Sequence, residues 1–174
     1  NLIDKIKNQT INPWELLVED HGDICFGKII QCRFGSNSDK KIYLIGDSHM
    51  ASLSYSLKEK LVSNNYQLIA STNGIFCFEG FDVISLKNNE IDKFCINQFD
   101  TFRKNLPQEK NSIIIFGGRF PLYLNNSYFN NFEGGIENQK IKFKYLSKNN
   151  YNSLSVSFNT EVLRLSKNNK IIIV

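Results

Sequence analysis

The chain has 174 residues, of which 41% are hydrophobic, 13% aromatic and 22% charged. This composition is typical of one folded domain with a hydrophobic core, and it excludes both a disordered chain and two full domains. No apolar run approaches the ~20 residues that a membrane helix needs. The net charge of +4 is mild, and no basic stripe carries interleaved aromatic residues, so we expect no nucleic-acid partner.

The two ends of the sequence predict a segment of a longer protein. Met50 is the only methionine, and no signal peptide opens the chain. Residues 170–174 form an apolar run in which a strand is still beginning when the sequence stops. We therefore expect the C-terminal part of the domain to be missing.

Residues 1–40 predict an irregular leader with short helical patches at 2–7 and 14–18 and a strand at 28–34. From residue 41 to residue 174, strands and helices alternate as one domain. The expected strands span 41–45, 66–71, 112–117 and 170–174, and the expected helices span 51–63, 91–106 and 153–166. The polar residues 125–150 predict an inserted segment, a hairpin with Gly134 and Gly135 at its turn.

Hydrophobic spacing supports these elements. Leu53, Leu57 and Leu61 recur every four residues, which favours one buried face of a helix. Residues 113–116 are all Ile or Phe, which is typical of a strand covered on both faces. The alternation of strands and helices predicts an α/β fold with three layers, a parallel sheet with helices on both faces.

In parallel sheets the active site lies beyond the carboxyl ends of the strands. The strongest signal at such a place is Gly46-Asp47-Ser48-His49, directly after the strand at 41–45. Ser48 then stands near a helix N-terminus, where free backbone N–H groups favour a developing anion, as a nucleophilic serine requires. The alternative is that Asp47 or Ser48 only caps the helix.

The four cysteines are Cys25, Cys32, Cys77 and Cys95. They form no CxxC pair and have no histidine at metal-ligand spacing, so we expect no zinc site. Three pairings are possible, of which Cys25 with Cys32 and Cys77 with Cys95 close two local loops. Disulfides would indicate an oxidising compartment such as the periplasm, whereas four reduced, buried cysteines would fit the cytosol.

The segment IYLIGDSHMASLSYSL, residues 42–57, resembles the first sequence block of SGNH/GDSL hydrolases, which have a flavodoxin-like fold. Its GDSH form is most similar to the SGNH domains of acyltransferase family 3 proteins, membrane O-acetyltransferases that modify bacterial surface polysaccharides. The subgroup's other features here are the pair Cys25 and Cys32, Ser71-Thr72-Asn73-Gly74 followed by Cys77, and IIIFGGRFPLYL at 113–124. The resemblance covers about residues 25–124 and favours both local disulfides.

The resemblance implies a role for each matched residue. Ser48 is the nucleophile, and its backbone N–H forms the oxyanion hole with the loop at Asn73 and Gly74. Arg119 replaces the third-block Asn of other members, and its guanidinium donates to the oxyanion or holds the substrate. The alternative for Arg119 is a surface arginine at a strand end.

Asp47 and His49 are expected to support this site. Asp47 fixes the turn by accepting backbone N–H groups, and His49 is a structural residue whose ring points away from the Ser48 hydroxyl. Tyr123 packs in the core in preference to lining the pocket.

One part of the family pattern is absent. The general base and its acid partner belong to an Asp-x-x-His block after the last strand, but the only histidines here are His21 and His49. His21 lies in the leader, and neither histidine fits that block. Without a base the serine is a weak nucleophile, so we expect residues 1–174 alone to be inactive.

The predicted function is acetyl transfer to a sugar hydroxyl of a bacterial surface polysaccharide through an acyl-Ser48 intermediate. The acetyl donor comes from a fused or partner membrane acyltransferase domain, and the acceptor is a polysaccharide or a lipid-linked sugar. The domain then works in the periplasm or on the extracytoplasmic face of the membrane, tethered to that membrane domain, without a metal or organic cofactor. The alternatives are a non-catalytic module that binds glycan and a free-standing secreted carbohydrate esterase.

Overall fold

The computed structural model describes residue 25 and residues 31–72, 74–124, 129–130, 136–137, 143–148 and 153–174. Several predictions lie outside these residues: the helical patches before residue 25, residues 28–30 of the strand at 28–34, His21, Asn73, and the turn at Gly134 and Gly135.

The centre of the fold is a five-stranded sheet in the order β1-β3-β2-β5-β9. Its strands are β1 (Cys32–Phe34), β2 (Lys41–Gly46), β3 (Gln67–Thr72), β5 (Ile113–Gly117) and β9 (Lys170–Ile173). Strands β3, β2, β5 and β9 run parallel, which confirms the predicted parallel sheet. β1 pairs antiparallel with β3 at one edge, so a strand from the expected leader belongs to the same sheet.

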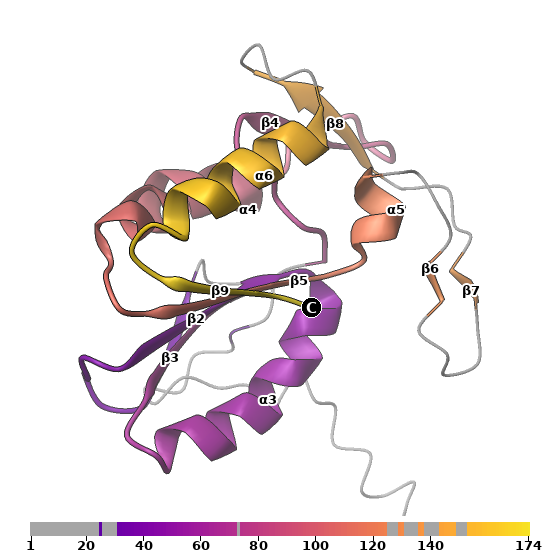
Figure 1. Ribbon diagram of the computed structural model, residues 1–174. Coiled ribbons are helices and arrows are strands. Elements are labelled where there is room, and N and C mark those ends of the chain that lie inside the picture. Colours follow the sequence, from indigo (N-terminus) through magenta and orange to yellow (C-terminus); the bar gives the residue numbers. More distant parts are fainter. Residues whose placement is uncertain are drawn as a thin grey trace, which may run out of the picture.

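Helices cover both faces of this sheet, as predicted (Figure 1). α3 (Ser48–Val62) lies on one face, and α4 (Lys93–Asn97) and α6 (Leu154–Leu165) lie on the other. Alternate residues of β2 enter the two halves of the core: Ile42 and Leu44 on the α3 side, Tyr43 and Ile45 on the other. A strand buried on both faces needs the continuous apolar run that the sequence shows.

The buried face of α3 is rotated from the predicted one. Leu57 and Leu61 pack against the core, but Leu53 is 37% exposed. The buried positions of the first turns are Met50, Ala51 and Ser54. The helix begins at Ser48, three residues before the predicted start. Its first turns therefore pack against the sheet through Met50 and the small residues Ala51 and Ser54, and Leu53 faces away from the core.

The predicted helix at 91–106 is three shorter pieces. α4 starts after Asp92, whose carboxylate accepts from the backbone N–H groups of Phe94 and Cys95. A π-helical turn, Gln98–Phe102, follows, and then a 3-10 turn, Arg103–Gln108, which contains Pro107. Hydrophobic spacing does not distinguish these wider and tighter turns from an α-helix.

A second, two-stranded sheet lies above the helical face and was not predicted. β4 (Phe81–Ser85) pairs antiparallel with β8 (Phe143–Ser147), so part of the segment at 125–150 completes a sheet with distant residues. Within the same segment, β6 (Phe129–Asn130) and β7 (Ile136–Glu137) pair antiparallel, as the predicted hairpin requires.

Both local disulfides are present, Cys25–Cys32 and Cys77–Cys95. The first joins the chain before β1 to β1 itself. The second joins the loop that follows β3 to α4, so that loop is held to the helical face by a covalent bond.

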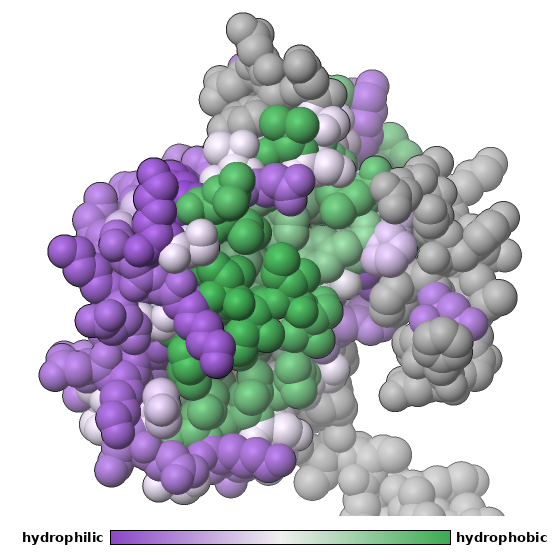
Figure 2. Space-filling model, viewed as in Figure 1, coloured by the Kyte–Doolittle hydropathy of each residue, from purple (hydrophilic) through white to green (hydrophobic). Residues whose placement is uncertain are grey.

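No helix in the described part of the chain is long and apolar enough to cross a membrane. Hydrophobic side chains do gather on one face of the molecule, across the edge strand β9 and toward α6 (Figure 2). Leu163, Ile172, Ile173 and Val174 are among the exposed large hydrophobic residues.

Candidate active site

Ser48 lies where the sequence predicted it, on the turn between β2 and α3 at the carboxyl edge of the sheet. Asp47 is the N-cap of α3, with extended backbone angles (φ −91°, ψ −165°), and its Oδ1 accepts from the backbone N–H of His49 at 3.0 Å. Ser48 is therefore the first helical residue and is half-buried. A group at this place faces the positive end of the helix dipole.

Close packing explains the glycine at the start of this turn. A Cβ atom on Gly46 would lie 2.4 Å from Cγ of Met50 and 2.5 Å from the carbonyl oxygen of Gly117. The neighbouring end of β5 is equally tight, since a Cβ atom on Gly117 would meet the Met50 sulfur at 2.1 Å. The two strand ends and the first turn of α3 therefore touch with no room for side chains, which holds Ser48 close to the sheet.

Asp47 does more than cap a helix. Its side chain is fully buried, and Oδ2 accepts from the backbone N–H of Arg119 at 3.1 Å and from Arg119 Nε at 3.0 Å. The Tyr123 hydroxyl donates to the same oxygen at 2.5 Å. Asp47 thus joins the ends of β2 and β5 to α5 (Phe120–Leu124). A buried carboxylate requires such a set of donors.

Gly118 is required by the same contact. Its φ of +155° is one that side chains rarely adopt, and a Cβ atom there would lie 3.2 Å from the Asp47 carboxylate. The second glycine of the Gly117-Gly118 pair therefore lets Arg119 approach Asp47.

The Arg119 guanidinium bridges Asp47 and the loop after β3. Nη2 donates to the carbonyl oxygen of Gly74 at 2.9 Å, and the side chain is only 18% exposed. The alternative of a simple surface arginine does not describe this position. The structure thus brings together Asp47, Ser48, Gly74 and Arg119 from three different loops, whereas Asn73 lies outside the described residues.

Tyr123 has a role at the site that was not predicted from the sequence. It is buried, as expected for core packing, but its hydroxyl is part of the Asp47 cluster. Burial, followed by the negative charge of Asp47, raises the pKa of Tyr123 far above its usual value, so the hydroxyl stays a donor. The signal was the four-residue spacing from Arg119, which places both residues on one side of a helical turn.

The described residues of this cluster are Asp47, Ser48, Gly74, Arg119 and Tyr123, which include no histidine. The backbone N–H of His49 binds Asp47, and the predicted orientation of its ring stays a prediction. Among the residues that the structure describes, no group of three or more His, Cys, Asp or Glu side chains is placed to hold a metal ion.

The sequence matches the family described as "SGNH domain (fused to AT3 domains)" over residues 12–174. The chain belongs to this SGNH domain family. The SGNH domain is thus of the general esterase and acyltransferase type, in a family whose members are fused to AT3 domains. No curated protein and no solved structure matches the chain significantly.

Proposed function

We propose that this SGNH domain transfers an acetyl group to a sugar hydroxyl of a bacterial surface polysaccharide, with Ser48 as the nucleophile. The observation that carries the proposal is the position of Ser48. It is the first residue of α3, half-buried, on a turn held by the buried Asp47.

The chemistry runs in two steps. The Ser48 Oγ forms a bond to the acetyl carbonyl carbon, its proton passes to a base, and the donor's leaving group departs with a proton. The acceptor hydroxyl then attacks the Ser48 ester and loses its proton to the base, and Ser48 Oγ regains a proton. Each step passes through an oxyanion, which the backbone N–H groups of Ser48 and Gly74 would stabilise.

Arg119 has two tasks in this scheme. By donating to the Gly74 carbonyl and to Asp47, its guanidinium sets the distance between the Gly74 loop and the Ser48 turn. Its positive charge beside Ser48 also lowers the energy of a developing oxyanion in a partly water-excluded site.

The family description supports a membrane acyltransferase domain as the source of the acetyl group. The family is described as an SGNH domain fused to AT3 domains, which implies a membrane acyltransferase partner domain. In our proposal, that partner domain supplies the acetyl group to Ser48. The disulfides Cys25–Cys32 and Cys77–Cys95 support an oxidising compartment, and we propose the periplasm or the extracytoplasmic face of the membrane.

Labelling with a serine-reactive alkyl phosphonate tests the assignment of Ser48. The complete protein should acquire one phosphonyl group on Ser48, and Ser48→Ala should remove the label. Ser52→Ala is the matched control, because Ser52 is exposed one turn along the same helix, and it should label like the parent.

Equal labelling of Ser48→Ala and the parent would show that another residue is the nucleophile. A complete protein that takes no label at all would instead favour a non-catalytic module that binds glycan.

A further inference from the structure

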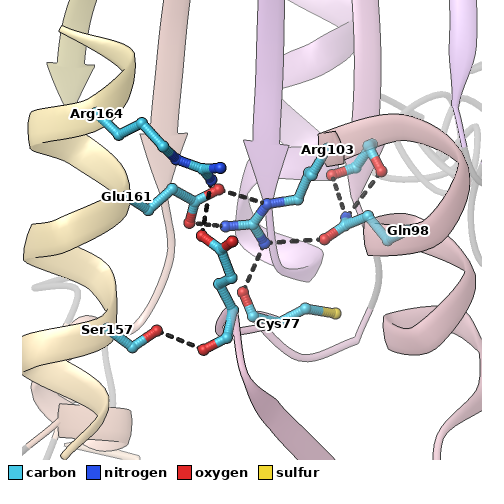
Figure 3. Close-up of polar contacts among 8 residues, drawn as sticks. Cys77, Gln98, Arg103, Ser157, Glu161 and Arg164 are labelled. Atoms are coloured by element: carbon cyan, nitrogen blue, oxygen red, sulfur yellow. Dashed lines mark hydrogen bonds and ion pairs between the residues drawn. The ribbon is translucent and has the colours of Figure 1, made fainter. Parts of the chain in front are cut away.

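A buried arginine lies beside the loop that follows β3, the loop that carries Gly74. Arg103 is 1% exposed, and its Nε and Nη2 donate to the two carboxylate oxygens of Glu161 on α6, the first at 2.9 Å (Figure 3). Its Nη1 donates to the backbone carbonyl of Cys77 at 2.7 Å and to Oε1 of Gln98 at 3.1 Å. One side chain therefore connects α6, the loop after β3 and the π-helical turn.

The π-helical turn makes this arrangement possible. In an α-helix, residues five apart lie on different sides, but the wider turn at 98–102 brings Gln98 and Arg103 together. The guanidinium also stacks on aromatic rings, with its carbon 4.1 Å from the ring centre of Phe99 and 5.6 Å from that of Phe76. Both its plane and its hydrogen-bond directions are fixed.

The contacts of Arg103 hold both ends of the loop that carries Gly74. Gln98, bound to Arg103 through its carbonyl oxygen, donates from Nε2 to the Ser71 hydroxyl at 2.8 Å. Ser71 is the penultimate residue of β3, and Cys77 is the other anchor. The loop after β3 is thus anchored at Ser71 and at Cys77, and both anchors are hydrogen-bonded, directly or through Gln98, to Arg103.

The positive charge of Arg103 costs free energy when buried, and Glu161 offsets that cost. An ion pair buried in this way is a weak source of stability, since well-packed apolar side chains serve as well or better. Its bonds are directional, however, and the bidentate Arg–carboxylate geometry fixes the guanidinium to a fraction of an ångström. The arrangement is suited to holding a loop in one position.

We infer that Arg103 and Glu161 are positioning residues, which hold the loop after β3 so that the backbone N–H of Gly74 meets the oxyanion formed at Ser48. This inference rests on the proposed function. Glu161 acts through Arg103, and Arg103 acts through the Cys77 carbonyl and Gln98. Neither side chain touches the reacting atoms.

Two variants of the complete protein test the inference. Arg103→Met/Glu161→Leu replaces the pair with apolar side chains of similar size, which keeps most of the stability. Arg103→Lys retains the charge opposite Glu161 but lacks the planar fork that serves three acceptors at once. The control is Lys41→Met/Glu109→Leu, a partly exposed pair at the amino-terminal end of β2, away from the Ser48 turn.

The measurement is the rate of Ser48 modification by the phosphonate, resolved into the rate constant at saturation and the half-saturating concentration. A displaced oxyanion loop lowers the rate constant, by about 10-fold to 100-fold in both Arg103 variants, and leaves the half-saturating concentration within about threefold. The thermal midpoint of Arg103→Lys should stay near that of the parent, and the control pair should keep the parent rate constant.

A parent-like rate constant in Arg103→Lys, or in a folded Arg103→Met/Glu161→Leu, would overturn the inference and leave the proposed function standing. If the double variant does not fold, Arg103→Lys alone decides. Parent protein that does not react, or Ser48→Ala that reacts as fast as the parent, would overturn the proposed function, and this inference with it.

Discussion

Ser48→Ala is expected to reduce acetyl transfer by the complete protein by about 10³-fold or more, because no acyl-enzyme can form without the Ser48 Oγ. The stability of the fold should change little. The side chain is half-buried at the surface of the turn, and within the described residues its hydroxyl makes no hydrogen bond. Transfer is measured as acetyl groups incorporated into the polysaccharide by cells that carry only the variant.

The control for this experiment is again Ser52→Ala, which keeps a serine at position 48 and should retain parent-level transfer. Equal expression and equal thermal midpoints of the two variants make the comparison direct. Parent-level acetylation with Ser48→Ala would mean that the turn between β2 and α3 has only a structural role.

The largest loss of stability is expected from Asp47→Ala. It removes the carboxylate that accepts from the Arg119 guanidinium, the Tyr123 hydroxyl and the backbone N–H of His49. It also removes the negative charge beside the partly buried Arg119 guanidinium. Removing one member of a buried pair costs about 3–5 kcal/mol, so the free energy of unfolding should fall by about that amount. Denaturant unfolding followed by circular dichroism measures it.

Two further substitutions show how much of the loss of stability comes from single contacts of Asp47. Tyr123→Phe removes one hydrogen bond to Asp47 and should cost about 1–2 kcal/mol. Glu59→Ala, an exposed carboxylate on the same helix, should stay within about 0.5 kcal/mol of the parent. If Asp47→Ala were as mild as Glu59→Ala, Asp47 would be no more than an ordinary cap.

The inner strands of the central sheet could be predicted from sequence because they are buried on both faces. Ile113–Phe116 is entirely apolar, the run from Ile42 to Ile45 has the Tyr43 hydroxyl as its one polar side-chain group, and both strands lie within one residue of their predicted bounds. The small sheet of β4 and β8 could not be predicted in the same way. Its strands are separated by nearly sixty residues, β8 is largely exposed, and cross-strand pairing at that distance leaves no local period.

The Ser48 turn was predicted for a local reason, since a glycine, a capping residue and a serine between strand and helix dictate its geometry. The contacts that hold it are not local. Asp47 meets Arg119 across 72 residues and Tyr123 across 76. Arg103 meets Glu161 across 58 residues, and a hydrophobic pattern does not mark a charged residue that is buried inside a helix.

Mass analysis of the peptide that contains Ser48 tests the central claim most directly. The complete protein, supplied with an acetyl donor and quenched in acid before acceptor is added, should carry the mass of one acetyl group on Ser48, and the group should leave when acceptor sugar is added. An acetyl group found on another residue, or transfer that proceeds while Ser48 stays unmodified, would contradict the account.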